Sequence, residues 1–402
     1  MKRKTVICLM TSFESLNATF ATLGNIYEFL SKKFKKIYII NSDNLRYFPI
    51  KKKIVLSKDV KNRSKRIILL NIKDKNEFDK FIFKKKVILI NNFGKSFFDL
   101  KIHFLLKKKN IHQIRIGNVG NIQTSRKIFL KKFYFSLKYL FLNRFFIYIT
   151  NFLSLVRLID KIDINFTSNK NIINSLKKNR LKNFLFENNF FFSKKFVLIN
   201  SKFYDELNIN RNKIKKDYIV HLDYFLNYYH EKEIRGKITE KLLKIHHNNI
   251  CEFLKCAQNK LKKKVIICIH PNYPINYFQK YYKDFKVVKF KTKEMIQRAD
   301  FVSFFNSSAI ISAILLNKKI VQLNTKLIDK NFEITNERYQ KILGLNLTYL
   351  ENFQCRNFSN LYKNSTINKN KIKSFVETLH CHDKRKSAEQ RIFDTLKKVY
   401  SI

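Results

Sequence analysis

The chain has 402 residues, enough for two ordinary domains that each bury a hydrophobic core. Hydrophobic residues make up 45% of the chain, which excludes an intrinsically disordered protein. The 82 Lys and Arg residues against 30 Asp and Glu give a net charge of +52. Because the lysines are spread over the whole chain, we predict an anionic membrane surface or an anionic substrate as partner, and not nucleic acid.

The cysteines and histidines show no metal-binding pattern. Six cysteines are scattered: Cys8, Cys251, Cys256, Cys268, Cys355 and Cys381. None of their spacings matches a zinc site, and the adjacent residues His380, Cys381 and His382 rarely converge on one ion. We therefore expect no metal, no resident cofactor and no disulfide framework, which favours a reducing, cytoplasmic compartment.

One segment is a candidate for contact with a membrane. The N-terminal "MKRKTVICLMTS" has too short an apolar run for a signal peptide. Residues 129–159 are rich in aromatic and basic side chains, but their uncharged part, residues 145–156, is shorter than the roughly 20 residues that span a bilayer. Either amphipathic helices lie on the inner face of the cytoplasmic membrane as a peripheral anchor, or an ordinary helix packs between the domains.

The first half of the chain alternates short apolar runs with helical patterns. The runs lie at residues 5–10, 35–41, 66–71, 86–91, 113–117, 163–169 and 194–201. Continuous apolar runs separated by helices predict a parallel sheet covered on both faces, whose ligands bind beyond the carboxyl ends of the strands. The polar stretch 202–217 has no apolar period, so we expect domains at 1–205 and 206–402.

The second half repeats this pattern. Strands are predicted at residues 218–223, 263–270, 285–290, 300–305 and 318–324, and helices at 238–261, 292–299, 307–316 and 371–400. The predicted fold class is α/β, with two doubly wound Rossmann-like domains that face a cleft.

The first notable strand-to-loop junction is "VIICIHPNYP", residues 265–274. Pro271 ends the strand because it has no backbone N–H to donate, and it pushes His270 toward an extended backbone. The imidazole could then donate to a phosphate oxygen or protonate a leaving group. The alternative is a strand-ending histidine that a neighbouring carbonyl satisfies.

The second junction is "FFNSSAIISAILL", residues 304–316. Asn306 follows a strand, and Ser307 and Ser308 open a predicted helix, where hydroxyl and backbone N–H groups either bind an anion or simply cap the helix. The loop between the two junctions contains Lys291 and Thr292, the second of them the expected N-cap of the next helix. This loop could lie against a nucleobase or a ribose.

The two junctions together resemble the nucleotide-binding domain of bacterial glycosyltransferases that use CMP-sugars. Sialyltransferases, polysialyltransferases and capsule Kdo transferases carry a His-Pro motif followed by a Ser-Ser or Ser-Thr motif. His270 and Pro271 match the first motif, and Ser307 and Ser308 match the second, which contacts the donor phosphate. Residues 218–325 also look like proteins encoded with surface-polysaccharide genes, those of capsule and lipopolysaccharide.

This resemblance implies a GT-B fold and a metal-independent transfer from a nucleotide-sugar, with a CMP-sugar as one candidate donor, to a surface glycan or a lipid-linked acceptor. Such families use an acidic residue of the first domain as general base, often in an acidic pair followed by glycine, and that motif is missing here. Glu14 is the nearest substitute by position, and Asp223, at the end of a strand of the second domain, is another. Each also fits an ordinary loop acid.

Further polar and glycine residues follow strands of the first domain and are candidates for acceptor binding: Asn17, Gly117, Asn118 and Gly120. The glycines indicate either a close approach of the backbone to a ligand or a tight turn. Their spacing is not GxGxxG, so it gives no reason to propose NAD.

Two other functions remain open. A nucleotide-sugar epimerase of the same fold would need several carboxylates in its site, and this chain is poor in acids there. A non-catalytic, basic protein that binds membrane surfaces or polyanions would owe its function to the net charge alone.

Overall fold

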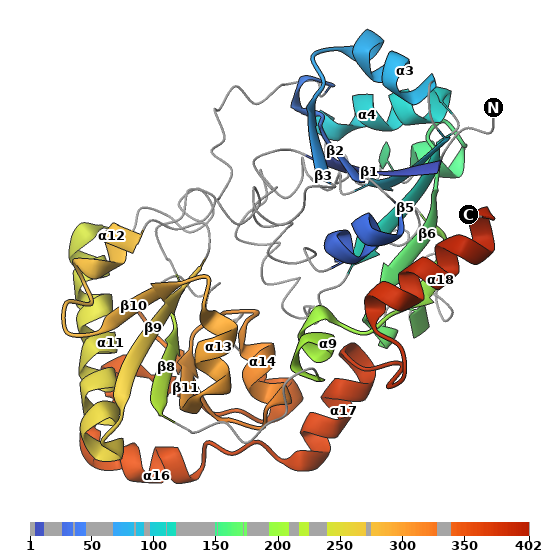
Figure 1. Ribbon diagram of the computed structural model, residues 1–402. Helices are drawn as coiled ribbons and strands as arrows, with labels where there is room; N and C mark the ends of the chain where they lie inside the picture. Colours follow the sequence, from blue (N-terminus) through green and yellow to red (C-terminus); the bar gives the residue numbers. More distant parts are fainter. Residues whose placement is uncertain are drawn as a thin grey trace. The chain divides into compact units, whose positions relative to one another are not determined.

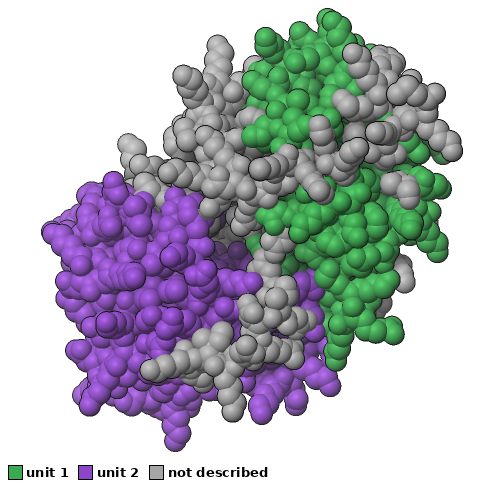
Figure 2. Space-filling view, in the orientation of Figure 1, with its two compact units in different colours: residues 1–120, 137–202, 378–402 green, residues 121–136, 203–377 purple. Residues whose placement is uncertain are grey.

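A computed structural model describes the chain at residues 5–11, 26–34, 37–45, 67–83, 86–91, 97–109, 111–117, 149–150, 152–171, 173–174, 193–208, 217–224, 239–270, 275–327 and 339–401. The chain divides into two compact units (Figure 2). Unit 1 comprises residues 1–120, 137–202 and 378–402, and unit 2 comprises residues 121–136 and 203–377.

Unit 1 contains a seven-stranded parallel sheet. Its strands are β1 (Thr5–Thr11), β2 (Ile37–Asn41), β3 (Ile67–Asn71), β4 (Lys86–Asn91), β5 (His112–Gly117), β6 (Ile162–Thr167) and β7 (Ser193–Leu198). They lie in the order β3-β2-β1-β4-β5-β6-β7, so the direction of winding reverses between β1 and β4. All seven strands overlap the predicted apolar runs.

Helices cover both faces of this sheet (Figure 1). They are the helix at residues 26–33, η2 (Asp43–Leu45), α3 (Lys75–Phe83), α4 (Phe97–Lys108) and α18 (Ala388–Tyr400). Successive strand residues point to opposite faces: Ile7 belongs to the core under α18 and the helix at 26–33, whereas Cys8 belongs to the core under α3 and α4.

The C-terminal helical region differs from the prediction of one helix over residues 371–400. α17 (Lys369–Leu379) ends before a loop at 380–387, and α18 begins after Ser387, whose side chain accepts from the N–H of Gln390 at 3.3 Å. Ile392 and Leu396 of α18 are fully buried in the core of unit 1, although the sequence-based division placed this region in the second domain. The apolar spacing predicts which face of the helix is buried, but not which sheet it meets.

Unit 2 contains a six-stranded parallel sheet. Its strands are β8 (Tyr218–Leu222), β9 (Lys264–Ile269), β10 (Lys286–Lys289), β11 (Ala299–Phe304), β12 (Lys319–Asn324) and β13 (Leu347–Tyr349). The order β10-β9-β8-β11-β12-β13 reverses between β8 and β11. The short strand β13 was not predicted, because three half-buried residues make no apolar run.

The described helices that lie wholly or mostly in unit 2 are α9 (Lys202–Asn208), α11 (Glu240–Leu261), α12 (Ile275–Gln279), α13 (Thr292–Gln297), α14 (Ile310–Leu315), η3 (Leu350–Asn352), η4 (Cys355–Asn357), α16 (Phe358–Lys363) and α17. The long helix α11 packs with α16 over one face of the sheet, where Ile219, Ile267 and Phe301 form the core. The predicted fold class, two doubly wound Rossmann-like units, is confirmed.

One disulfide was not anticipated. Cys256 on α11 pairs with Cys355 in η4, 99 residues further along the chain. The expectation that the cysteines form no disulfide is therefore wrong for this pair, since the two residues meet only when η4 packs against α11.

None of the described helices combines the length and the apolar character that crossing a bilayer requires. Of the segment at 129–159, residues 149–150 and 152–159 are described, and the rest lies outside the described residues.

Candidate functional site

Polar residues gather where the strands of unit 2 end. Leu222 of β8 pairs with Cys268 of β9 on one side and with Phe304 of β11 on the other. Continuing this register by two residues sets Tyr224 between His270 and Asn306. These strand ends flank the reversal between β8 and β11, the place where open α/β sheets bind ligands.

His270 directly follows β9, and its side chain is exposed to solvent. Partial desolvation and the positive charge of Lys289, at the end of the neighbouring strand β10, hold the pKa of His270 below its usual value. The imidazole is therefore neutral at neutral pH and can donate from one ring nitrogen while accepting at the other. Pro271 lies outside the described residues.

The serine junction differs from the predicted helix start. α14 begins at Ile310 after Ala309, so Ser307 and Ser308 belong to a turn and not to the first helical turn. The Oγ of Ser307 accepts from the N–H of Ala309 at 3.3 Å, which stabilises this turn. Asn306 and Ser307 are half-buried, whereas Ser308 is exposed and available to a ligand.

The loop at Lys291 also differs in detail. Lys291, not Thr292, is the N-cap of α13, and its side chain makes no capping hydrogen bond. Burial raises the pKa of the Cys268 thiol on β9 to about 12, and Thr292 at the start of α13 opposes this shift. Lys291 itself is exposed.

Asp223 lies at the expected strand end, but its side chain is fully enclosed. Its Oδ1 accepts from the N–H of Tyr224 at 2.7 Å, while Oδ2 has no partner of normal hydrogen-bond geometry among the described residues. Burial raises the pKa of Asp223 to about 7, against the opposing hydrogen bonds from Tyr224 and Tyr282. The prediction of an acid that faces solvent at this edge does not match this enclosure.

Asp223 belongs to a buried polar cluster on the α11 side of the sheet, a group that we define as His221, Asp223, His246, His247, Tyr282 and Ser303. His221 Nδ1 shares a 3.0 Å hydrogen bond with Ser303 Oγ, and His247 Nδ1 shares one of 2.9 Å with the hydroxyl of Tyr282. Burial lowers the pKa of His221 to about 3 and that of His247 to about 4. Sequence reasoning missed this cluster, although the spacing of His221 and Asp223 places both on one face of β8.

Four of the candidates in unit 1 lie outside the described residues: Glu14, Asn17, Asn118 and Gly120. Gly117 ends β5, and a Cβ there would lie 3.4 Å from the carbonyl oxygen of Phe166, an ordinary contact. The neighbouring strand β6 therefore does not require a glycine at this position.

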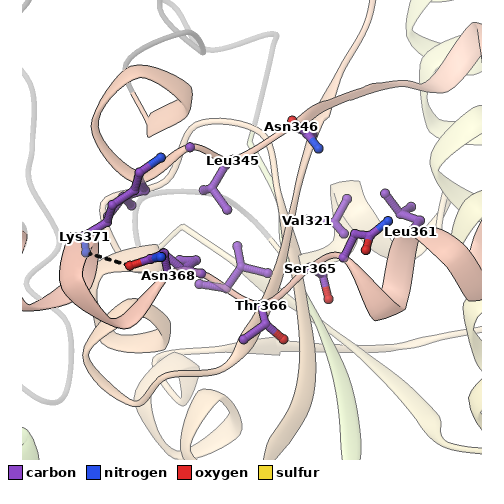
Figure 3. A pocket seen from close by; sticks show the side chains of 13 residues that line it. Val321, Leu345, Asn346, Leu361, Ser365, Thr366, Asn368 and Lys371 are labelled. Carbon is purple, nitrogen blue, oxygen red and sulfur yellow. Dashed lines mark hydrogen bonds between the residues drawn. The ribbon is translucent and has the colours of Figure 1, made fainter.

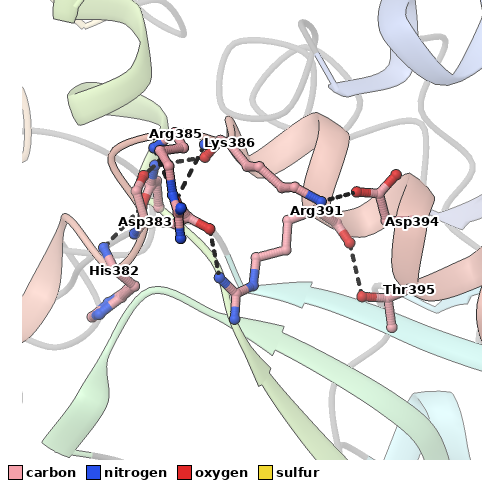
Figure 4. Close-up of polar contacts among 8 residues, drawn as sticks. His382, Asp383, Arg385, Lys386, Arg391, Asp394 and Thr395 are labelled. Carbon is pink, nitrogen blue, oxygen red and sulfur yellow. Dashed lines mark hydrogen bonds and ion pairs between the residues drawn. The ribbon is translucent and has the colours of Figure 1, made fainter.

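The run His380-Cys381-His382 has a structural role in the loop before α18. His380 Nδ1 shares a 2.8 Å hydrogen bond with Ser201 Oγ, and His382 Nε2 donates to the carbonyl of Ser168. Figure 4 shows the rest of this loop, where Asp383 accepts from the backbone N–H of Arg385 at 2.9 Å. Within the described ranges, no group of three His, Cys, Asp or Glu side chains is arranged to hold a metal ion.

A pocket of about 180 Å³ in unit 2 lies beside β12 and the residues that precede β13 (Figure 3). Val321 of β12 and Leu345, just before β13, line it together with Ser365 and Lys371. Ile320 and Val321 lie near the amino end of β12, and the lining includes none of the predicted site residues.

Comparison with known proteins defines the fold. No protein-family model matches the sequence, and no curated protein sequence does. Among solved structures, the chain is similar to a putative UDP-N-acetylglucosamine 2-epimerase from Listeria monocytogenes (TM-score 0.54, 10% identity, 100% of this chain and 97% of that chain covered). It is also similar to CalG4, the calicheamicin glycosyltransferase (0.52, 7%, 99% and 98%), and to the glycotransferase of kitacinnamycin (0.51, 7%, 99% and 99%). At these identities the likeness concerns the fold alone.

Proposed function

We propose that the protein is a glycosyltransferase that takes a sugar from a nucleotide donor bound at the carboxyl edge of unit 2. The observation that carries this proposal is the alignment of His270 and the turn at 306–308 on either side of β8, at the reversal of the sheet. The exposed Ser308 hydroxyl and the exposed imidazole are groups that donate to phosphate oxygens.

The electrostatics of this edge suit a departing nucleotide. Lys289 ends β10 and Lys291 follows it, one strand away from His270, and both add positive charge without a metal ion. Fixed positive charge and hydrogen-bond donors stabilise the negative charge that develops on the leaving phosphate. His270, neutral at pH 7, hydrogen-bonds a phosphate oxygen in this scheme.

The proposed general base is Glu14. Asp223, the other acid considered, is enclosed on the α11 side of the sheet, where an acceptor hydroxyl would have to displace packed side chains. A CMP-sugar as donor, and a surface glycan or a lipid-linked acceptor, are proposed from the resemblance of the His-Pro and Ser-Ser motifs.

The test is a thermal-shift panel of CMP, UDP, GDP and their sugars. A ligand at one hundred times its Kd stabilises the protein by about 2.7 kcal/mol, so one nucleotide class should raise Tm clearly. His270→Ala and Ser308→Ala should each weaken the binding of that nucleotide by about 10- to 100-fold, since each removes a hydrogen bond to a charged group. Ser359→Ala, an exposed serine on α16, is the matched control. Unchanged binding in both site variants would reject this site.

An epimerase is the second candidate, because the fold is shared with a putative UDP-N-acetylglucosamine 2-epimerase. Incubation with UDP-N-acetylglucosamine and NMR of the sugar decides between the reactions: an inverted C2 centre without an acceptor identifies an epimerase. A protein that binds only polyanions would instead show salt-sensitive binding that His270→Ala leaves unchanged.

We also propose a peripheral position on an anionic membrane, at the inner face of the cytoplasmic membrane. Phe152, Leu155, Val156 and Leu158 are 45 to 56% exposed within seven residues, while Leu153 packs inward. Apolar side chains on a strongly basic protein suit an interface with anionic lipids. Sedimentation with phosphatidylglycerol vesicles should exceed that with phosphatidylcholine, and Phe152→Ser with Leu155→Ser should reduce it; equal sedimentation with both lipids would contradict the proposal.

A further inference from the structure

Phe290 has an unusual backbone. It directly follows β10 and has φ of 66°, in the left-handed region that bulky residues avoid. Among the described non-glycine residues with positive φ, it is the one aromatic residue. A backbone of this kind persists only where the surrounding structure enforces it, and such positions cluster at ligand sites.

The other described residues with positive φ have an ordinary explanation. Lys262 and Ser401 are the C-caps of α11 and α18, and Asn317 follows the C-cap of α14. Arg157 and Gly344 likewise lie just after short helical segments, at residues 152–155 and 339–343. Helices commonly end with one left-handed residue. Phe290 ends a strand and not a helix, so this explanation does not apply to it.

The ring of Phe290 is also exposed to solvent. The residue is 52% exposed, whereas Phe253, Phe301 and Phe358 of the same unit are fully buried. The Nζ of Lys289 lies 5.1 Å from the ring centroid, a cation–π distance. An exposed aromatic ring beside a cation is a surface suited to a flat, anionic ligand.

The position of Phe290 matches the far end of a nucleotide. Lys289 pairs with Ile269, so the next residues, Phe290 and His270, lie at the same level of neighbouring strands. β10 lies two strands from β8, about 10 Å at the usual strand spacing of about 4.8 Å. A nucleotide whose phosphate lies near the reversal beside β8 would extend its base toward β10.

We propose that Phe290 is the platform on which the nucleobase of the donor stacks, with Lys289 and His270 beside the ribose phosphate. This inference rests on the proposed function and assigns the base-binding end of that same site. Every nucleobase has a π face, so an aromatic side chain supplies affinity for the base as a class.

The absence of tryptophan from the chain allows a direct test. Phe290→Trp introduces a single indole, whose fluorescence a stacked base quenches. Saturable quenching is expected with at least one of CMP, UDP, GDP or ADP, and none with ribose 5-phosphate, which has no base. Phe152→Trp, an exposed position in unit 1, is the matched reporter and should not be quenched. Equal responses to ribose 5-phosphate and to nucleotides would overturn the stacking role.

In two further variants, the change in nucleotide affinity and the change in Tm should differ from each other. Phe290→Ala should weaken nucleotide binding by about 5- to 150-fold, the range of one base–aromatic stack. Phe290→Gly should weaken it equally while raising Tm by about 2 to 4 °C, because glycine adopts positive φ without strain. Lys262→Gly is the matched control for backbone relief, and should raise Tm without any change in binding.

The outcomes distinguish a failure of the stacking role from a failure of the proposed function. If the unmodified protein binds a nucleotide and Phe290→Ala binds it equally well, the stacking inference is overturned and the proposed function stands. If the unmodified protein shows no thermal shift with any nucleotide or nucleotide-sugar, the proposed function fails, and the base platform fails with it.

Discussion

Asp223 is an acid that the folded chain encloses. Its pKa of about 7 lies above that of an exposed aspartate because burial disfavours the charged form more than the hydrogen bonds from Tyr224 and Tyr282 favour it. Between pH 4 and 7, the folded state therefore holds a proton that the unfolded chain releases. The contribution of Asp223 to stability falls as the pH rises through this window.

Asp223→Asn should consequently stabilise the protein relative to the unmodified chain as the pH rises. The difference in unfolding free energy should grow by about 1.4 kcal/mol for each pH unit between 4 and 7, and should level off above pH 7. Guanidinium unfolding of both proteins at pH 5 and pH 8 measures it. A difference that is the same at both pH values would show that Asp223 is ionised throughout.

At the residue scale, the sequence predicted the place of each site residue along the chain, but not how buried or exposed its side chain would be. His270, Asn306 and Ser308 follow strands because apolar runs end there, and such runs are visible in the sequence. The enclosure of Asp223 depends on α11, and the exposed ring of Phe290 on the backbone after β10. Neither contact is local in sequence.

At the scale of elements, the buried polar cluster joins β8 to α11. Its histidines His221, His246 and His247 all have lowered pKa values, chiefly through burial. The unfolded chain binds their protons near pH 6.5, whereas the folded chain stays neutral there. Stability from these groups is therefore lost as the pH falls below about 6.5, and three histidines outweigh the opposite effect of one aspartate.

Unit 2 should therefore unfold in mild acid. Between pH 6 and pH 4.5 its Tm should fall steeply, with up to about 1.4 kcal/mol lost per pH unit and per histidine. Hydrogen exchange of the β8 and α11 amides at the two pH values provides the measurement. Constant protection of these amides would contradict the buried, neutral state of the cluster.

α18 provides the second prediction for an element. Leu396 is fully buried in the core of unit 1, so Leu396→Ala should destabilise that unit by about 2 to 5 kcal/mol. Hydrogen exchange should show lost protection in β1 and β4, with the strands of unit 2 unaffected. The exposed neighbour Lys397→Ala is the matched control, and equal loss of protection in both units would contradict the assignment of α18 to unit 1.

At the scale of the whole molecule, the net charge of +52 opposes the compact state. Exposed charges are screened over about 10 Å at 0.1 M salt and over about 3 Å at 1 M. Raising NaCl from 50 to 500 mM should therefore raise Tm, as scanning calorimetry can measure. A lower Tm at high salt would indicate that ion pairs, and not self-repulsion, dominate the surface.

Apolar runs and their spacing determined, from the sequence alone, the twelve longer strands, their parallel arrangement and the two doubly wound units. These properties follow from period and length, which each short segment carries by itself. Only the tertiary structure decided which strands flank the reversals, that α18 completes the core of unit 1, and that Cys256 meets Cys355. It also decided that "VIICIHPNYP" leads to an exposed histidine beside Lys289 and Phe290. Each of these depends on residues that are distant in sequence and adjacent only when the sheets form, and no local pattern encodes such a contact.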